Sequence, residues 1–122
     1  MGRILLVDDD KDMLMITERW FLKEGYEVYT AASGKEAIDI LGNVLPDVIL
    51  LDFYMPQMDG PEVLRHIRSD ERTRKIPVLF RTGKEDAEST GIIEELSPEG
   101  VVFKTDGKKE VLSAVRKYMP AL

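Results

Sequence analysis

The chain has 122 residues, the size of one ordinary domain, and we expect residues 1–122 to form a single domain. Its 17 Lys and Arg residues against 23 Asp and Glu residues give a net charge of -6, which argues against non-specific binding to nucleic acid or to an anionic membrane. The absence of cysteine excludes disulfides and thiolate metal sites. No apolar stretch approaches the roughly 20 residues that a membrane helix needs, and the run at 4–7 is too short for a signal peptide, so we expect a cytoplasmic protein.

The first part of the chain alternates short apolar runs with amphipathic segments. The run at 3–7 predicts a buried strand, and it ends in three consecutive acids at 8–10. The segment from 11 to 24 has apolar residues at a spacing of three to four, which predicts a helix with one face directed to the core. After a strand at 27–30, Ser33 and Glu36 have the spacing of a capping box, which predicts a second helix as far as Leu41.

The stretch at 47–60 organises the rest of the chain. Its apolar run from Val48 to Leu51 is unbroken, as is typical of a parallel strand that helices cover on both faces. The run stops at Asp52, so this carboxylate is expected at the carboxyl end of a central strand, where open α/β sheets place their ligand chemistry. Pro56 and Gly60 indicate that a loop follows.

The second half continues the same alternation. Pro61 suits the first turn of a short amphipathic helix, whose His66 we expect to be a solvated surface residue, since no second histidine or cysteine could complete a metal site with it. The later patterns predict a strand at 78–80, a helix at 84–97, a strand at 100–103 and a helix at 111–119.

Five strands that alternate with five helices predict a doubly wound (βα)5 three-layer α/β sandwich of the flavodoxin-like type, with a five-stranded parallel sheet in the order 2-1-3-4-5. In that topology the carboxyl ends of the first, third, fourth and fifth strands meet at one edge. This edge is expected to collect the polar residues Asp8, Asp9, Asp52, Thr82 and Lys104.

These residue types together indicate phosphoryl chemistry. Carboxylates that converge within a few ångströms raise each other's pKa unless a cation joins them, and an all-oxygen set with few protein ligands suits Mg²⁺. Lys104 can neutralise an anionic oxygen and Thr82 can donate a hydroxyl hydrogen bond, with Asp52 as the nucleophile. The alternative for each residue is structural, and for Lys104 it is a simple ion pair.

The chain resembles the receiver domains of response regulators, the CheY-like domains of two-component signalling, over essentially all of its length. The resemblance lies in the acids after the first strand, in the string D-x-x-M-P-x-M-D-G from Asp52 to Gly60, in Thr82 and in Lys104. Thr82 lies thirty residues after Asp52, and Lys104 lies twenty-two residues after Thr82, as in that family.

The resemblance implies a role for each of these residues. Asp52 would accept a phosphoryl group from a sensor histidine kinase or a phosphotransfer protein. Asp9 and Asp52, with the backbone carbonyl of Tyr54, would bind Mg²⁺ directly, and Asp8 would act through a metal-bound water. Lys104 would contact the phosphoryl group.

The resemblance also implies a switch. Thr82 would move toward the phosphoryl group and shift an equilibrium between two surface states, so that a downstream protein is regulated through the face of the fourth helix, fifth strand and fifth helix. Tyr54 and Lys84 would tune the lifetime of the phosphoryl group. Such a domain catalyses only its own phosphorylation and dephosphorylation, is a monomer or weak dimer, and needs neither nucleic acid nor membrane.

Three positions depart from the family pattern. Val101 stands where many receivers have the aromatic switch residue, and Phe103 is expected on the same side of the strand. Thr105 replaces a proline that often forms a cis peptide bond, so we expect a trans bond or a strained cis bond after Lys104. Arg81 replaces an apolar residue; either its guanidinium reaches solvent while its stem packs, or it partly fills the space that Val101 leaves.

Other functions remain open at this point. A degenerate receiver would act as a protein-interaction module without phosphorylation. A Mg²⁺-dependent phosphatase of the haloacid dehalogenase type needs an acid two residues after the nucleophile, where this chain has Tyr54. A nucleotide-binding domain is disfavoured because no G-x-G-x-x-G or P-loop motif follows the first strand.

Overall fold

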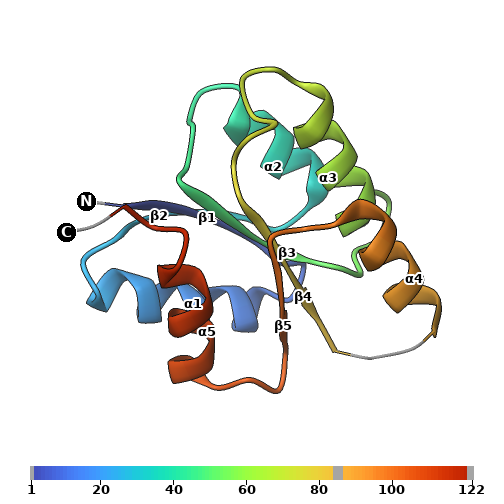
Figure 1. The fold of residues 1–122 in the computed structure, drawn as a ribbon. Coiled ribbons are helices and arrows are strands. Elements are labelled where there is room, and N and C mark those ends of the chain that lie inside the picture. The colour runs from blue at the N-terminus through green and yellow to red at the C-terminus, as the bar shows by residue number, and fades with distance from the viewer. Residues whose placement is uncertain (1, 84–86, 121–122) are drawn as a thin grey trace.

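The computed structural model describes residues 2–83 and 87–120 and has a single parallel sheet between two layers of helices (Figure 1). The strands are β1 (Arg3–Val7), β2 (Glu27–Ala31), β3 (Val48–Asp52), β4 (Val78–Thr82) and β5 (Gly100–Phe103). The helices are α1 (Lys11–Lys23), α2 (Gly34–Leu41), α3 (Gly60–Ser69), α4 (Ala87–Leu96) and α5 (Lys108–Arg116). The strand order is β2-β1-β3-β4-β5, and every pairing is parallel. This confirms the expected fold and strand order.

Local signals in the sequence account for where several helices begin. The Asp10 carboxylate accepts hydrogen bonds from the backbone N–H groups of Asp12 and Met13 at the start of α1. The Ser33 hydroxyl accepts one from the N–H of Glu36 at the start of α2, as the capping box predicts. The Asp59 carboxylate caps α3 in the same way. Each cap fixes the residue at which its helix begins, and so limits the length of the loop between that helix and the preceding strand at the carboxyl edge of the sheet.

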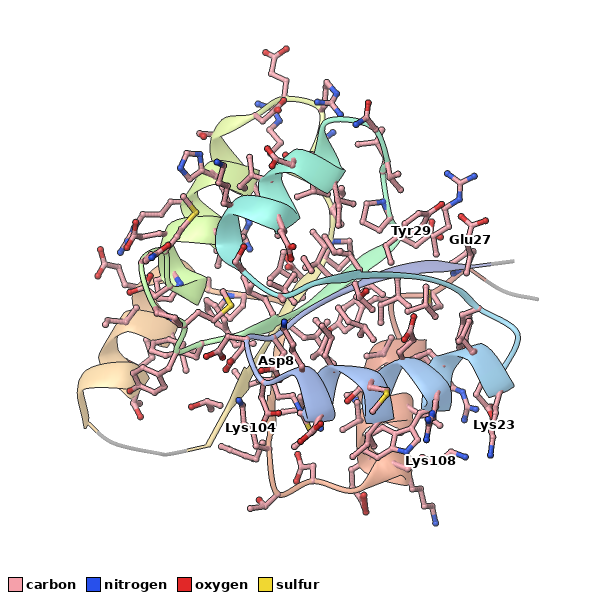
Figure 2. All side chains as sticks on the ribbon, turned by 180° about the vertical axis from the view of Figure 1, so that it is seen from behind. Asp8, Lys23, Glu27, Tyr29, Lys104 and Lys108 are labelled. Carbon is pink, nitrogen blue, oxygen red and sulfur yellow. The ribbon has the colours of Figure 1, made fainter. Side chains whose placement is uncertain are left out.

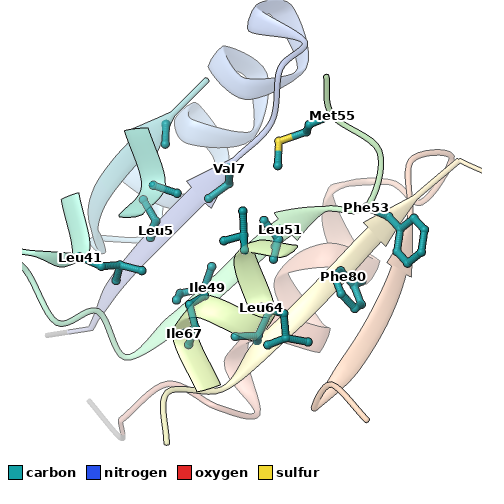
Figure 3. Close-up of a cluster of buried hydrophobic side chains, with 14 residues drawn as sticks. Leu5, Val7, Leu41, Ile49, Leu51, Phe53, Met55, Leu64, Ile67 and Phe80 are labelled. Carbon is teal, nitrogen blue, oxygen red and sulfur yellow. The ribbon is translucent and has the colours of Figure 1, made fainter. Parts of the chain in front are cut away.

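Two buried clusters hold the helices to the sheet, one on each face. The first, which we call the α2–α3 core, takes alternate strand residues such as Leu51 and Phe80 and packs them against α2, α3 and the apolar side of α4 (Figure 3). The second, the α1–α5 core, takes the intervening residues Leu50, Leu79 and Val102. Side chains alternate across a strand, so membership of a core tells which face of the sheet a residue occupies.

The last two helices differ in extent from the predicted ones. α4 is described from Ala87, and residues 84–86, where the prediction placed its beginning, lie outside the described residues. α5 begins at Lys108, earlier than expected, and ends at Arg116. The apolar residues Tyr118 and Met119 follow in a turn and still pack against the α1–α5 core, which explains why they continued the helical pattern. No helix within 2–83 and 87–120 is both long and apolar enough to span a membrane.

Candidate functional site

The carboxyl edge of the sheet brings three aspartates together. Asp8 and Asp9 follow β1, and Asp52 is the last residue of β3, next to β1 in the sheet. One carboxylate oxygen from each of the three lies within 4.8 Å of the others. Asp8 and Asp52 are buried, at 5% and 2% exposure, whereas Asp9 is exposed. The predicted convergence of these acids is therefore present, with one side open to solvent.

Lys104 completes this cluster from the other side. Its ammonium nitrogen lies 3.2 Å from Asp52 Oδ2 and 3.5 Å from Asp8 Oδ1, and its backbone N–H donates to the carbonyl of Thr82 at 3.0 Å. Figure 2 shows Asp8 and Lys104 near each other beside the first turn of α1. The ion pair expected as the structural alternative for Lys104 thus exists, and it is made with the two buried aspartates.

The cluster has unusual electrostatics. Burial, the neighbouring charge of Asp8 and a hydrogen bond with the Asp9 side chain raise the pKa of Asp52 from 3.8 to about 8, against the opposing effect of Lys104. Burial lowers the pKa of Lys104, but the charges of Asp52 and Asp8 outweigh it and the net effect is a raised pKa. Burial and the neighbouring carboxylates therefore favour the protonated form of Asp52, and a further cation in the cluster would displace this proton.

The donor set of the cluster fits a hard divalent cation. All three side chains offer oxygen, and Asp8 Oδ2 is buried without a hydrogen-bond partner among the described residues, although Asp8 Oδ1 accepts from the Asp10 N–H and from Lys104. Mg²⁺ prefers oxygen ligands and commonly retains several waters, and the exposed side at Asp9 leaves room for them. The residues present therefore fit Mg²⁺.

The loop after Asp52 is held close to the strand by the glycine of the motif. A Cβ atom on Gly60 would lie 2.4 Å from the backbone oxygen of Asp52, and the Gly60 N–H donates to the carbonyl of Phe53 at 3.0 Å. Gln57 takes a positive φ of 68° as the chain turns. Only glycine permits this contact, so the spacing from Asp52 to Gly60 fixes how the loop returns to α3.

The remaining predicted site residues lie around the cluster. Thr82 ends β4, is buried, and stands opposite Phe103 in the β4–β5 register. Tyr54 is half exposed and its ring packs edge-on against Phe53, with 4.8 Å between the ring centroids. Val101 is exposed at 37% and stands opposite Phe80, on the face of the α2–α3 core. The predicted lifetime-tuning residue Lys84 lies outside the described residues.

Of the departures from the family pattern, two have simple outcomes. The Lys104–Thr105 peptide bond is trans, as are the other peptide bonds between described residues. Phe103 shares the face of Val101, since Val102 between them belongs to the α1–α5 core.

Both hypotheses for Arg81 are wrong. Its side chain is only 3% exposed, so its guanidinium does not reach solvent. It also points away from Val101, because Arg81 pairs in register with Val102 and its Nη1 donates to the hydroxyl of Thr17 in α1 at 2.9 Å. The guanidinium carbon lies 5.9 Å from the centre of the Trp20 ring. Strand alternation could have placed Arg81 on the face opposite to Phe80 and Thr82, but no sequence signal gives its register with Val101 or pairs it with α1.

Comparison with known proteins shows which family and which solved structures the chain resembles. The family model of the response regulator receiver domain matches residues 4–116. Chemotaxis protein CheY4 of Vibrio cholerae is 27% identical, with a TM-score of 0.90, over 97% of this chain and 98% of that one. The signal receiver domain of a histidine kinase from Syntrophus aciditrophicus is 26% identical, with a TM-score of 0.91, over 97% of this chain and 89% of that one.

A third solved structure shares the fold at lower identity. The receiver domain of a sensor histidine kinase from Pseudomonas aeruginosa is 24% identical, with a TM-score of 0.88, over 96% of both chains, and that structure holds a magnesium ion in its active-site cleft.

Proposed function

Because the chain belongs to the response regulator receiver domain family of two-component signalling, we propose that residues 1–122 act as one phosphorylatable switch whose acceptor is Asp52. The observation that supports this most directly is the cluster itself: Asp8, Asp9 and Asp52 lie within 4.8 Å of one another, and the Lys104 ammonium lies 3.2 Å from Asp52. Family membership alone would leave a degenerate receiver possible, but here acceptor, acids and lysine are present together.

In the proposed reaction the phosphorus–nitrogen bond of a phosphohistidine breaks and a bond forms between phosphorus and a carboxylate oxygen of Asp52. The donor is a sensor histidine kinase or a phosphotransfer protein, whose imidazole regains a proton. Lys104, already at the carboxylate, would neutralise charge on the phosphoryl oxygens.

The metal would be held by Asp9, Asp52 and the Tyr54 carbonyl, with Asp8 acting through a metal-bound water. Mg²⁺ bound there would supply the positive charge that keeps Asp52 ionised and offsets the charge of the phosphoryl group. Since the pKa of Asp52 is about 8 without metal, Mg²⁺ binding near pH 7 should release a proton and should strengthen as the pH rises toward 8.

The output of the switch would follow Thr82. Its hydroxyl lies at the end of β4, and its movement toward a phosphoryl group on Asp52 would free space beside Phe103, its partner in the register. Val101 is too small and too exposed to act as the usual aromatic switch, so Phe103 is the aromatic side chain that can follow Thr82. The affected surface would be that of α4, β5 and α5, through which a downstream protein is regulated.

The test is intact mass spectrometry after incubation with acetyl phosphate, with and without Mg²⁺. The matched control is Asp52→Asn, which keeps the shape of the side chain. A gain of one phosphoryl group that needs Mg²⁺ and disappears in the variant is the expected result. An unmodified native chain, which also fails to bind the stable phosphoryl mimic beryllofluoride, would refute the proposal and favour an interaction module that works without phosphorylation.

A further inference from the structure

Arg81 places a second buried cation beneath the acidic cluster. It stands opposite Asp52 in the β3–β4 register and occupies the sheet face that α1 and α5 cover. The hydroxyl of Thr17 donates to the carbonyl of Met13 at 2.8 Å, so it meets the Arg81 Nη1–H group as an acceptor. Burial lowers the pKa of Arg81, against the opposing charges of Asp8, Asp52 and Asp106. These carboxylates compensate a charge that would otherwise be costly to bury.

Two of the three guanidinium nitrogens of Arg81 are buried without a hydrogen-bond partner among the described residues. Its Nε and Nη2 atoms are buried and have no partner among the described residues, and the same holds for Asp8 Oδ2. Arg81 and Asp8 line one small cavity, together with Thr17 and the apolar side chains of β1, β3 and α1. The cavity measures about 10 Å³, which is roughly the least volume that holds one water molecule. The two residues that carry the unused donors and the unused acceptor thus line the same water-sized space.

We propose that Arg81 is a positioning residue for the metal site: it binds one buried water that bridges its guanidinium to Asp8 Oδ2, and its charge weakens Mg²⁺ binding at the acidic cluster. This inference rests on the proposed Mg²⁺-dependent function. A bridging water satisfies groups that would each cost free energy if left unpaired in the interior. It also makes Asp8 a carboxylate that two cations share: Arg81 would act on it from the sheet face that α1 covers, and the metal from the solvent side.

The direction of the effect follows from charge. Once Mg²⁺ binding has displaced the proton of Asp52, three ionised aspartates face two cations, Lys104 and Arg81, so the cluster around the metal carries one net negative charge instead of the two it would carry without Arg81. A unit charge that acts on a divalent ion over about 10 Å changes affinity by well over a factor of ten at an effective dielectric constant near 20. Salt and the water on the Asp9 side screen much of this. We expect the loss of the Arg81 charge to tighten Mg²⁺ binding about fivefold.

The experiment measures the Mg²⁺ dissociation constant by isothermal titration calorimetry for the native chain and matched variants. Arg81→Met removes the charge and keeps most of the stem, whereas Arg81→Lys keeps the charge. Arg65→Met removes the same charge from the exposed side of α3. We expect about fivefold tighter binding for Arg81→Met and values within about twofold of native for the other two.

A purely structural role for Arg81 predicts the opposite sign, since a loosened site binds metal more weakly. Equal or weaker Mg²⁺ binding by a cooperatively folded Arg81→Met variant would therefore overturn the inference. If that variant does not fold, Arg81→Gln decides the matter. Glutamine removes the charge and keeps hydrogen-bond donors in the buried site, so Mg²⁺ binding should again tighten, and equal or weaker binding by this variant would overturn the inference. A native chain that binds no Mg²⁺ would instead refute the proposed function.

Discussion

Asp52 should destabilise the folded chain at the pH at which it works, and Asp52→Asn should recover that stability. The carboxyl group has a pKa of about 8 in the folded chain against its ordinary value of 3.8, which serves as the reference for the unfolded chain. Between about pH 4 and pH 8 the folded state therefore holds a proton that the unfolded state has lost, and the free energy of unfolding falls as the pH rises across this window. Above pH 8 the full loss is present.

The magnitude follows from the size of the shift. One pKa unit corresponds to 1.36 kcal/mol, so a change from 3.8 to about 8 corresponds to about 6 kcal/mol in total, most of it between pH 5 and pH 8.5. Asp8 and Lys104 share the pocket and can relax around the charge, so we expect the measured part to be about 2–4 kcal/mol. Asparagine keeps the shape of the side chain and carries no charge, so the free energy of unfolding of Asp52→Asn should not show this decrease with pH.

The assay is urea unfolding in the presence of EDTA at pH 5 and pH 8.5, followed by the fluorescence of Trp20, the single tryptophan. The stability of Asp52→Asn minus that of the native chain should increase by about 2–4 kcal/mol between the two pH values. Asp39→Asn, on the exposed side of α2, should change stability by less than about 0.5 kcal/mol at both. A difference that does not grow with pH would refute the reasoning about the buried carboxyl group.

Other substitutions test separate parts of the site and its frame. Lys104→Met should slow phosphorylation of Asp52 by acetyl phosphate at least about tenfold in a time course of intact mass, because it removes the charge nearest the acceptor; an unchanged rate would exclude this role. Gly60→Ala should cost at least about 2 kcal/mol in urea unfolding, since its Cβ would lie 2.4 Å from a backbone oxygen. The control is Gly91→Ala in α4, because a Cβ atom at Gly91 would have no atom within 4 Å. This variant should be as stable as the native chain or more stable by up to about 1 kcal/mol, and an equal loss of stability in both glycine variants would contradict the steric argument. Ser33→Ala should cost about 1 kcal/mol through the lost cap of α2, and no loss would mean that the hydroxyl is dispensable there.

The acidic cluster could be predicted from the sequence because two strong patterns agree. The runs that end at Asp8 and Asp52 are apolar enough to be buried strands, and parallel strands present their carboxyl ends at one edge. The connection lengths then leave few strand orders, so the neighbourhood of β1 and β3 follows without any knowledge of side-chain contacts. A site whose residues all lie at the ends of strands can therefore be predicted from the pattern of apolar runs in the sequence.

Other features depend on contacts between distant elements, which no local pattern encodes. The end of α5 was predicted too late because Tyr118 and Met119, which lie in a turn after the helix, are partly buried against the α1–α5 core. An apolar residue at helical spacing can thus be packed without being part of the helix. Likewise, the raised pKa of Asp52 depends on how deeply its carboxyl group is buried and on how close Asp8 lies, against the opposing charge of Lys104. Spacing in the sequence gives the members of the cluster but not its degree of burial.

Arg81 combines one feature that the local sequence pattern predicts with one that depends on a contact between distant elements. Alternation along β4 requires Arg81 to face opposite to Phe80 and Thr82, so this part of its placement was present in the sequence. Its partner was not, because the match between Arg81 and Thr17 joins positions 64 residues apart and depends on how α1 lies across the sheet. A charged residue within an otherwise apolar strand is a local inconsistency, and such inconsistencies tend to mark function. Here the inconsistency stands beside β3, whose last residue Asp52 is the proposed acceptor, which is why we expect its effect in metal affinity.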